Sequence, residues 1–278
     1  SYQNDSLNIT EPFKGLFTQG MVCHETYKDE NNSWVSPDQI TSMNGKKYLK
    51  DDVTKEIQVG PSESMSKSKK NTIDPENIIN NYGADSARLF ILSDSPPEKD
   101  IQWSEEGISA SFKFIQKLWN LNKKTFEEIN KNHPQDSSDD LEKFTNKFIK
   151  KVTDNINNFS YNIIIANLHE MYSYLFKNID NGYKQNTIKK NYGKILTIMM
   201  PIIPHFSSEC LKMINLSYPK WPDYNEKIIS EDIINYVIQI NGKKRGLIES
   251  INDKSKEEVL ELVKKVPNIN KYLKNNKI

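Results

Sequence analysis

The stretch that decides the fold is SMSKSKKN at residues 64–71, followed by DPENIINNYGADSARLF at residues 74–90. The first part places three serines and three lysines in eight residues, which predicts a loop. Such a loop can close over a polyphosphate, because lysines match its negative charge while hydroxyl and backbone N–H groups donate to its oxygens. A serine and lysine run alone is more often only a solvated loop, so the residues that follow decide the interpretation.

Two consecutive helices are predicted directly behind this loop. Asp74-Pro75-Glu76 is a helix start, with Asp as the N-cap and Pro in the first turn, and Gly83 is a suitable C-cap. A second helix is expected to begin at Asp85 and to end before Pro96-Pro97. Asp85 and Arg88 lie three residues apart on it, and an ion pair between them is the expected interaction.

The residues before the loop predict strands. Residues 13–23 are apolar with interspersed Thr and Gln, which favours a buried strand. Asn44-Gly45 predicts a hairpin turn. Short strands are expected near residues 34–35, 47–49 and 57–59.

From Ser104 onward the pattern is helical for about 110 residues. Four amphipathic helices with short polar connections predict a helical bundle. The first opens at Ser104, the polar run QDSSDD at 135–140 is expected to be a loop, and His205 is expected to cap or pack at the start of a later helix. Trp119 and Tyr172 could stack on bases, although their helical spacing favours a place in the core.

The last segment alternates strand and turn signals. Residues 235–240 and 245–249 are strand-like around the turn signal Asn241-Gly242, and an amphipathic helix is expected over 256–265. Residues 241–278 hold ten Lys and Arg against five Asp and Glu. This part is therefore basic, although the whole chain has a net charge of only +1.

Length and composition narrow the class of protein further. A chain of 278 residues predicts two domains, or one domain with appendages. The two cysteines, Cys23 and Cys210, have no CxxC partner, so neither a disulfide framework nor a zinc site is predicted, and both are expected to be reduced thiols. No apolar run of about 18 residues is present, so we expect a cytoplasmic protein without a membrane segment.

The loop Ser64-Met65-Ser66-Lys67-Ser68 resembles the lysine–serine signature of class I aminoacyl-tRNA synthetases, usually written KMSKS. Its continuation through PPEKDIQW resembles the leucyl-tRNA synthetase branch, as do EPFKGLFTQGMV upstream and QINGKKRG downstream. These matches run in family order over nearly the whole chain. Ser64 departs from the family, because a lysine is usual at that position.

The resemblance implies an ATP-dependent ligase that activates leucine to leucyl-adenylate and transfers it to tRNA(Leu). Lys67, the second lysine of the motif, is expected to contact the ATP phosphates as the catalytic residue, with Met65, Ser66 and Ser68 shaping the phosphate-binding loop. Mg²⁺ is expected to arrive with ATP, and no protein-bound metal is predicted. Lys243, Lys244 and Arg245 are candidates for tRNA phosphate contacts, with a charged hairpin turn as the alternative.

The resemblance also predicts the domain organisation. The fold class is mostly α with small β parts. A remnant of the Rossmann-like catalytic domain is expected at 1–102, a helical anticodon-binding domain at 103–222 and a partial α+β C-terminal domain at 235–278. The first class I signature, His-x-Gly-His, does not occur. The chain is therefore expected to be a C-terminal fragment, inactive without the N-terminal part of a monomeric enzyme.

Two alternatives remain open. The chain could belong to another class I ligase for an aliphatic amino acid, namely isoleucine, valine or methionine, because these share the lysine loop and a YGADSAR-like helix. It could also be a non-catalytic tRNA-binding module derived from such an enzyme. Retention of the lysine loop argues against the second alternative, since a binding module has no use for a pyrophosphate contact.

Overall fold

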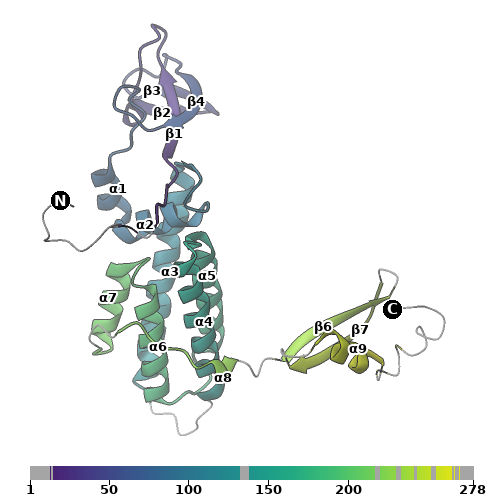
Figure 1. Cartoon of the computed structure of the whole chain (residues 1–278). Coiled ribbons are helices and arrows are strands. Elements are labelled where there is room, and N and C mark those ends of the chain that lie inside the picture. Colours follow the sequence, from purple (N-terminus) through teal and green to yellow (C-terminus); the bar gives the residue numbers. More distant parts are fainter. Residues whose placement is uncertain are drawn as a thin grey trace, which may run out of the picture.

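The computed structural model describes residues 13, 15–131, 138–216, 220–229, 233–240, 243–251, 255–264, 266 and 269. Figure 1 shows a small β-rich part, an elongated helical part and a hairpin with one helix near the C-terminal end. No helix within the described residues has both the length and the apolar character needed to cross a membrane.

The β-rich part is built on a three-stranded sheet in the order β4-β1-β5, formed by β4 (Gln58–Ser64), β1 (Val22–Lys28) and β5 (Ile101–Gln102). Strand β1 pairs antiparallel with β4 and parallel with β5. The predicted hairpin is also present as β2 (Ile40–Met43) and β3 (Lys46–Leu49). Its turn residues Asn44 and Gly45 have positive φ values of 52° and 79°, as a tight hairpin turn requires.

The prediction of a buried strand over residues 13–23 is wrong. The strand begins only at Val22, and the side chains of Leu16 and Met21 are 91% and 54% exposed. The segment before Val22 is instead held by isolated hydrogen bonds, such as the one that the Gly20 N–H donates to the Pro97 carbonyl at 2.8 Å. Apolar residues alone do not make a strand, which also needs a neighbouring strand to bond to. Residues 23–28 pair with β4, and Val22 and Cys23 pair with β5.

Gly20 is expected to be intolerant of a side chain. A Cβ at this position would lie 2.0 Å from the Lys99 carbonyl oxygen, which belongs to the backbone, whereas a Cβ at Gly15 would meet nothing within 4 Å. We predict that Gly20→Ala destabilises the chain by about 1–3 kcal/mol, and that Gly15→Ala changes the free energy of unfolding by less than about 0.5 kcal/mol. Urea unfolding of the two variants measures the difference, and equal midpoints would contradict the packing described.

Both predicted helices behind the lysine loop are confirmed, as α1 (Pro75–Tyr82) and α2 (Ala84–Ser93). The Asp74 carboxylate accepts from the Glu76 N–H at 3.0 Å, and Gly83 ends α1 with a φ of 81°. Ile78 of α1 and Phe90 of α2 share a buried apolar cluster with Ile101 and Ile108. This cluster joins the sheet, the two helices and the start of the next helix.

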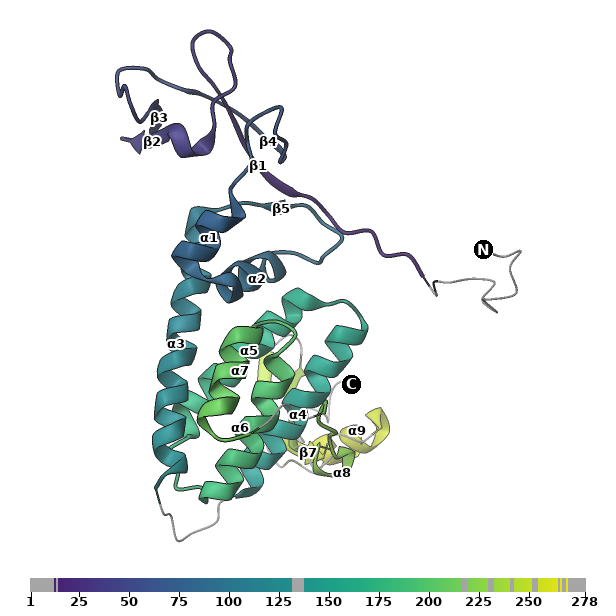
Figure 2. The same ribbon diagram turned by 90° about the vertical axis from the view of Figure 1, so that its left-hand side faces the viewer.

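The helical part contains α3 (Glu105–Ile129), α4 (Ser138–Asn157), α5 (Tyr161–Asn178), α6 (Gln185–Met199), α7 (Pro204–Met213) and the short α8 (Glu226–Ile229). Figure 2 shows α3 running from the region of α2 along the length of the bundle, and α3 contacts α1, α2, α5, α6 and α7. The predicted bundle is therefore confirmed, and α7 is the later helix that was expected to start at His205. Helix α4 starts at Ser138, so part of the predicted loop at 135–140 is helical.

The last part of the chain consists of β6 (Ile233–Ile240) and β7 (Lys243–Ile251), which pair antiparallel, followed by α9 (Lys256–Lys264). These elements confirm the predicted strands and helix. The turn Asn241-Gly242 lies outside the described residues. Ile238, Val263 and Ile269 form a small buried cluster between the hairpin and α9.

Candidate functional site

The lysine loop leaves the sheet at the end of β4. Ser64 is the last residue of β4 and pairs with Cys23 of β1. The Met65 N–H then donates to the Val22 carbonyl at 3.1 Å, so the path of the chain is still guided by β1 one residue beyond the strand. The motif therefore begins on a fixed strand end, and the free part of the loop starts only at Ser66.

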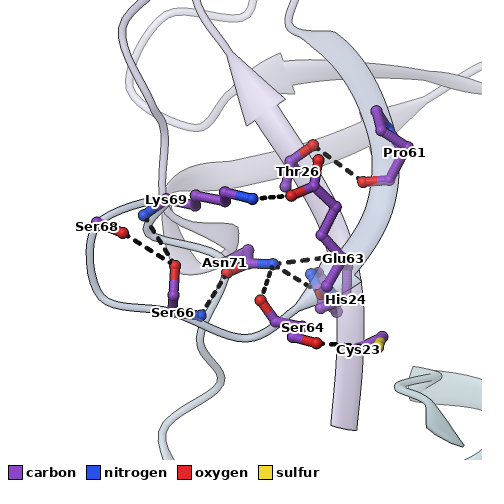
Figure 3. Close-up of polar contacts among 10 residues, drawn as sticks. All are labelled: Cys23, His24, Thr26, Pro61, Glu63, Ser64, Ser66, Ser68, Lys69 and Asn71. Atoms are coloured by element: carbon purple, nitrogen blue, oxygen red, sulfur yellow. Dashed lines mark hydrogen bonds and ion pairs between the residues drawn. The ribbon is translucent and has the colours of Figure 1, made fainter. Parts of the chain in front are cut away.

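Short-range hydrogen bonds fold the loop into one tight turn (Figure 3). The Ser66 hydroxyl lies 3.1 Å from that of Ser68 and accepts the Lys69 N–H at 3.3 Å. The Lys70 N–H donates to the Lys67 carbonyl at 3.3 Å, and Lys70 has a positive φ of 52°. The hydroxyl groups of Ser66 and Ser68 thus supply hydrogen bonds where the backbone forms no regular secondary structure.

The three lysines of the loop have different surroundings. Lys69 forms an ion pair with the Glu63 carboxylate of β4. Lys67 and Lys70 are exposed, and neither has an ion-pair partner among the residues that the structure describes. Of these two, Lys67 lines a cavity of about 1040 Å³.

This cavity lies between the β2–β3 hairpin, the loop and α1. Two further lysines line it, Lys47 on β3 and Lys50 directly after that strand, together with the acidic Asp38, Asp74 and Glu105. Sequence reasoning missed Lys47 and Lys50. Their run NGKKYLK is visibly basic, but only the folded hairpin brings it to the same cavity as Lys67.

Asp85 and Arg88 connect the loop-bearing part to the bundle. The Asp85 side chain is 8% exposed and accepts from the Phe206 N–H at 2.6 Å, the His205 N–H at 3.3 Å and the His205 ring Nδ1 at 2.9 Å. Arg88 donates through Nε to the Ile202 carbonyl at 3.0 Å. Asp85 therefore caps the N-terminus of α7 from a different helix.

The predicted ion pair between Asp85 and Arg88 is consequently wrong. Burial against α7 offers the carboxylate two backbone donors, and the guanidinium finds two orphan carbonyls at Pro201 and Ile202. Charged groups that bond to buried backbone gain more than an exposed pair on one helix. His205 lies at the predicted helix start, but the capping group is the Asp85 carboxylate rather than the imidazole.

The two aromatic side chains considered for base stacking belong to the bundle. Trp119 is half-buried and makes an edge contact with Phe206, with 6.3 Å between the ring centroids. Tyr172 meets Phe114 edge-on and is stacked on Phe176. Both side chains pack against the main apolar cluster, as their helical spacing predicts.

The basic candidates near the C-terminal end lie on β7. Lys244 and Arg245 are exposed on this strand, whereas the side chain of Lys243, its first residue, lies outside the described residues. Both described side chains are accessible to a large anionic partner.

The two cysteines and His24 are buried side chains. Burial raises the pKa of the Cys210 thiol to about 12. The His24 ring bonds through Nδ1 to the Glu25 carbonyl at 2.9 Å. Within the described residues, no group of three or more His, Cys, Asp or Glu side chains could hold a metal ion.

Comparison with known proteins decides the family. Residues 57–104, which include the lysine loop, match the model "tRNA synthetases class I (I, L, M and V)", and residues 138–261 match "Anticodon-binding domain of tRNA ligase". The chain is 39% identical to the leucine–tRNA ligase of Orientia tsutsugamushi over 98% of its length. The chain belongs to the leucyl-tRNA synthetase family.

Other leucyl-tRNA synthetase relatives agree with this assignment. The leucine–tRNA ligase of Rickettsia prowazekii is 37% identical over 98% of the chain. The chain spans about a third of the length of these curated relatives, namely 33% of the Orientia and of the Rickettsia proteins.

A solved leucyl-tRNA synthetase has the same fold. The agnB2 LeuRS of Agrobacterium radiobacter K84, determined in a ternary complex with tRNA and LeuAMS, matches with a TM-score of 0.65 at 20% identity. The match covers 78% of this chain and 30% of that one. The mostly helical fold with small sheets is therefore that of a leucyl-tRNA synthetase segment.

Proposed function

We propose that this chain provides the lysine loop, the anticodon-binding helical part and part of the C-terminal region of a leucine–tRNA ligase. Such an enzyme activates leucine with ATP to leucyl-adenylate and then transfers the leucyl group to tRNA(Leu). The observation that carries the proposal is the similarity to leucine–tRNA ligases over 98% of the chain. The geometry of Lys67 adds independent support, because its ammonium group has no partner among the described residues and lines a large cavity.

In this proposal Lys67 stabilises the pyrophosphate that departs when the leucine carboxylate attacks the α-phosphate of ATP. Attack at phosphorus requires positioning and charge stabilisation rather than covalent help from the protein. Only contacts that are stronger in the transition state raise the rate, and an ammonium group on a loop with fixed ends can provide such a contact. Mg²⁺ would accompany the ATP phosphates and supply further positive charge there.

The neighbouring residues have supporting roles. Met65, Ser66 and Ser68 would shape the phosphate-binding loop, since Ser66 and Ser68 form its internal hydrogen bonds and the Met65 N–H anchors it to β1. Lys69 is engaged by Glu63 and is therefore a less available cation than Lys67. The absence of a lysine at Ser64 leaves Lys67 as the main phosphate contact.

We further propose the division 1–102, 103–222 and 235–278 into catalytic, anticodon-binding-type and C-terminal tRNA-contacting parts of a monomeric enzyme. The bundle would lie along the tRNA and position its acceptor end, and the basic strand β7 would contact phosphates. The deep apolar core and the many lysines on the bundle surface are consistent with a scaffold that binds by shape and charge.

Neutralising Lys243, Lys244 and Arg245 together by glutamine is expected to weaken tRNA binding and to reduce its dependence on salt. Each lost phosphate contact lowers the slope of log K against log salt by roughly 0.7–0.9, so a decrease of about 2 is expected. Binding at several KCl concentrations measures the slope. A double variant at exposed lysines of the β-rich part that are paired with carboxylates, Lys46 and Lys55, is the control. An unchanged slope in the first variant would mean that these residues contact no phosphates.

A chimeric enzyme tests the function itself. The third of the Orientia tsutsugamushi leucine–tRNA ligase that matches this chain is replaced by it, and leucylation of tRNA(Leu) is measured. The proposal predicts charging, and a rate lower by about 100-fold or more when Lys67 is replaced by alanine. Tight tRNA binding without charging would favour the non-catalytic binding module instead.

A further inference from the structure

Asn71 closes the lysine loop from inside the sheet. Its side chain is completely buried, with an exposed fraction of 0%. The amide Nδ2 donates to the carbonyl oxygens of His24 on β1, at 3.2 Å, and of Glu63 on β4, at 3.1 Å, while Oδ1 accepts the Ser66 N–H at 2.8 Å (Figure 3). One side chain thus bonds to two strands and to the start of the free loop.

These contacts fix both ends of the segment that carries Lys67. Ser66 and Asn71 are five residues apart, and the bond between the Ser66 N–H and the Asn71 amide closes the backbone between them into a ring. The two bonds from Nδ2 attach that ring to β1 and β4. Residues 67–70 have no comparable buried anchor of their own among the described contacts, so their position depends on Asn71.

Glu63 supports the same arrangement from β4. Its carbonyl accepts from Asn71, and its carboxylate holds the Lys69 ammonium group in an ion pair. With Lys69 turned toward the sheet, Lys67 is the loop lysine left to face the cavity. The loop is therefore held at both ends, and Lys67 is its lysine that lines the cavity.

We propose that Asn71 is a positioning residue that holds the lysine loop in the conformation from which Lys67 reaches the departing pyrophosphate. This inference rests on the proposed function of the loop. A loop that is already fixed before the reaction loses little conformational entropy when Lys67 makes its contact in the transition state. The site requires an amide, because two carbonyls need donors and one N–H needs an acceptor. An ionised aspartate has no donor, and a serine hydroxyl has only one.

The first experiment tests the anchor on the chain itself. Trypsin cleavage at Lys67, Lys69 and Lys70 is followed by mass spectrometry in the wild type, in Asn71→Ala and in Asn80→Ala. Asn80 is an exposed asparagine on α1 and serves as the matched control. Release of the loop is expected to raise cleavage at these lysines by about tenfold in Asn71→Ala only, because proteolysis follows the population of the opened segment.

The second experiment tests the consequence in the chimeric ligase. For Asn71→Ala we expect kcat of leucine-dependent ATP–pyrophosphate exchange to fall by about 30-fold, with the KM values for leucine and ATP within about twofold of wild type, because the lost contact belongs to the transition state. A general loss of structure would instead reduce the amount of active enzyme and lower the thermal unfolding midpoint. Asn80→Ala is expected to behave as wild type.

Asn71→Ser keeps a polar group in the buried site and is used if the alanine variant does not fold. The same release of the loop and the same fall in kcat are expected, since a hydroxyl cannot span both strands. Cleavage and kcat within twofold of Asn80→Ala would overturn the proposal, as would a freed loop with unchanged kcat. A wild-type chimera without exchange would contradict the proposed function alone, and the cleavage experiment would still decide whether Asn71 anchors the loop.

Discussion

Replacing Lys67 by alanine in the chimeric ligase is expected to lower the rate of leucine-dependent adenylation by about 100-fold or more, as loss of a main transition-state charge contact does. The reason is the asymmetry of the loop, in which Lys69 is engaged by Glu63 while Lys67 lines the cavity without an ion-pair partner among the described residues. Single-turnover formation of leucyl-adenylate measures this rate directly.

Two variants serve as controls for Lys67→Ala. Lys123→Ala removes an exposed lysine of α3 and is expected to leave the rate unchanged. Lys69→Ala is expected to reduce the rate by less than about tenfold, since this lysine contributes mainly through its bond to Glu63. An unchanged turnover number in Lys67→Ala would exclude the assigned role.

Removal of the Asp85 carboxylate is expected to have the largest effect on stability. Asp85→Ala leaves the N–H groups of His205 and Phe206 without their acceptor in a buried interface, and we expect a loss of about 3 kcal/mol in the free energy of unfolding. Urea unfolding followed by circular dichroism measures the loss in the chain itself.

Asp94→Ala is the matched control for Asp85→Ala. Asp94 is an exposed aspartate at the C-terminal end of the same helix, and its removal is expected to change the stability by less than about 0.5 kcal/mol. Equal losses in the two variants would mean that the cap on α7 does not stabilise the junction between α2 and the bundle.

Local sequence signals predicted most of the helices. Asp74 and Gly83 delimit α1 as expected, and Ser104 caps α3 through its bond to the Gly107 N–H. Such caps depend on residues within one turn, and a sequence contains that information directly. The Asn44-Gly45 turn was predictable for the same reason, because few residues other than these adopt two positive φ values in succession.

Features that depend on distant partners were not predictable from the sequence. The apolar residues at 15–21 form no strand because the ladder positions beside β5 are taken by Val22 and Cys23. Asp85 lies 121 residues from the Phe206 N–H that it accepts, so an ion pair with nearby Arg88 was the natural but wrong expectation. Both errors follow from tertiary partners that outcompete local ones.

The candidate site was partly predictable. The KMSKS-like motif drew attention to Lys67, and its assigned role remains a prediction. The ion pair that engages Lys69 was not predictable, because it requires Glu63 to lie beside the loop at the end of β4. The role of Asn71 was likewise not predictable, since its bond to the His24 carbonyl spans 47 residues.

The measurement that tests the central claim most directly is amino-acid-dependent ATP–pyrophosphate exchange by the chimeric ligase, with leucine, isoleucine, valine and methionine compared at equal concentrations. The account predicts exchange with leucine that falls by about 100-fold or more in Lys67→Ala and is retained in Lys123→Ala. Absence of leucine-dependent exchange in a chimera that folds and still binds tRNA(Leu) would contradict it.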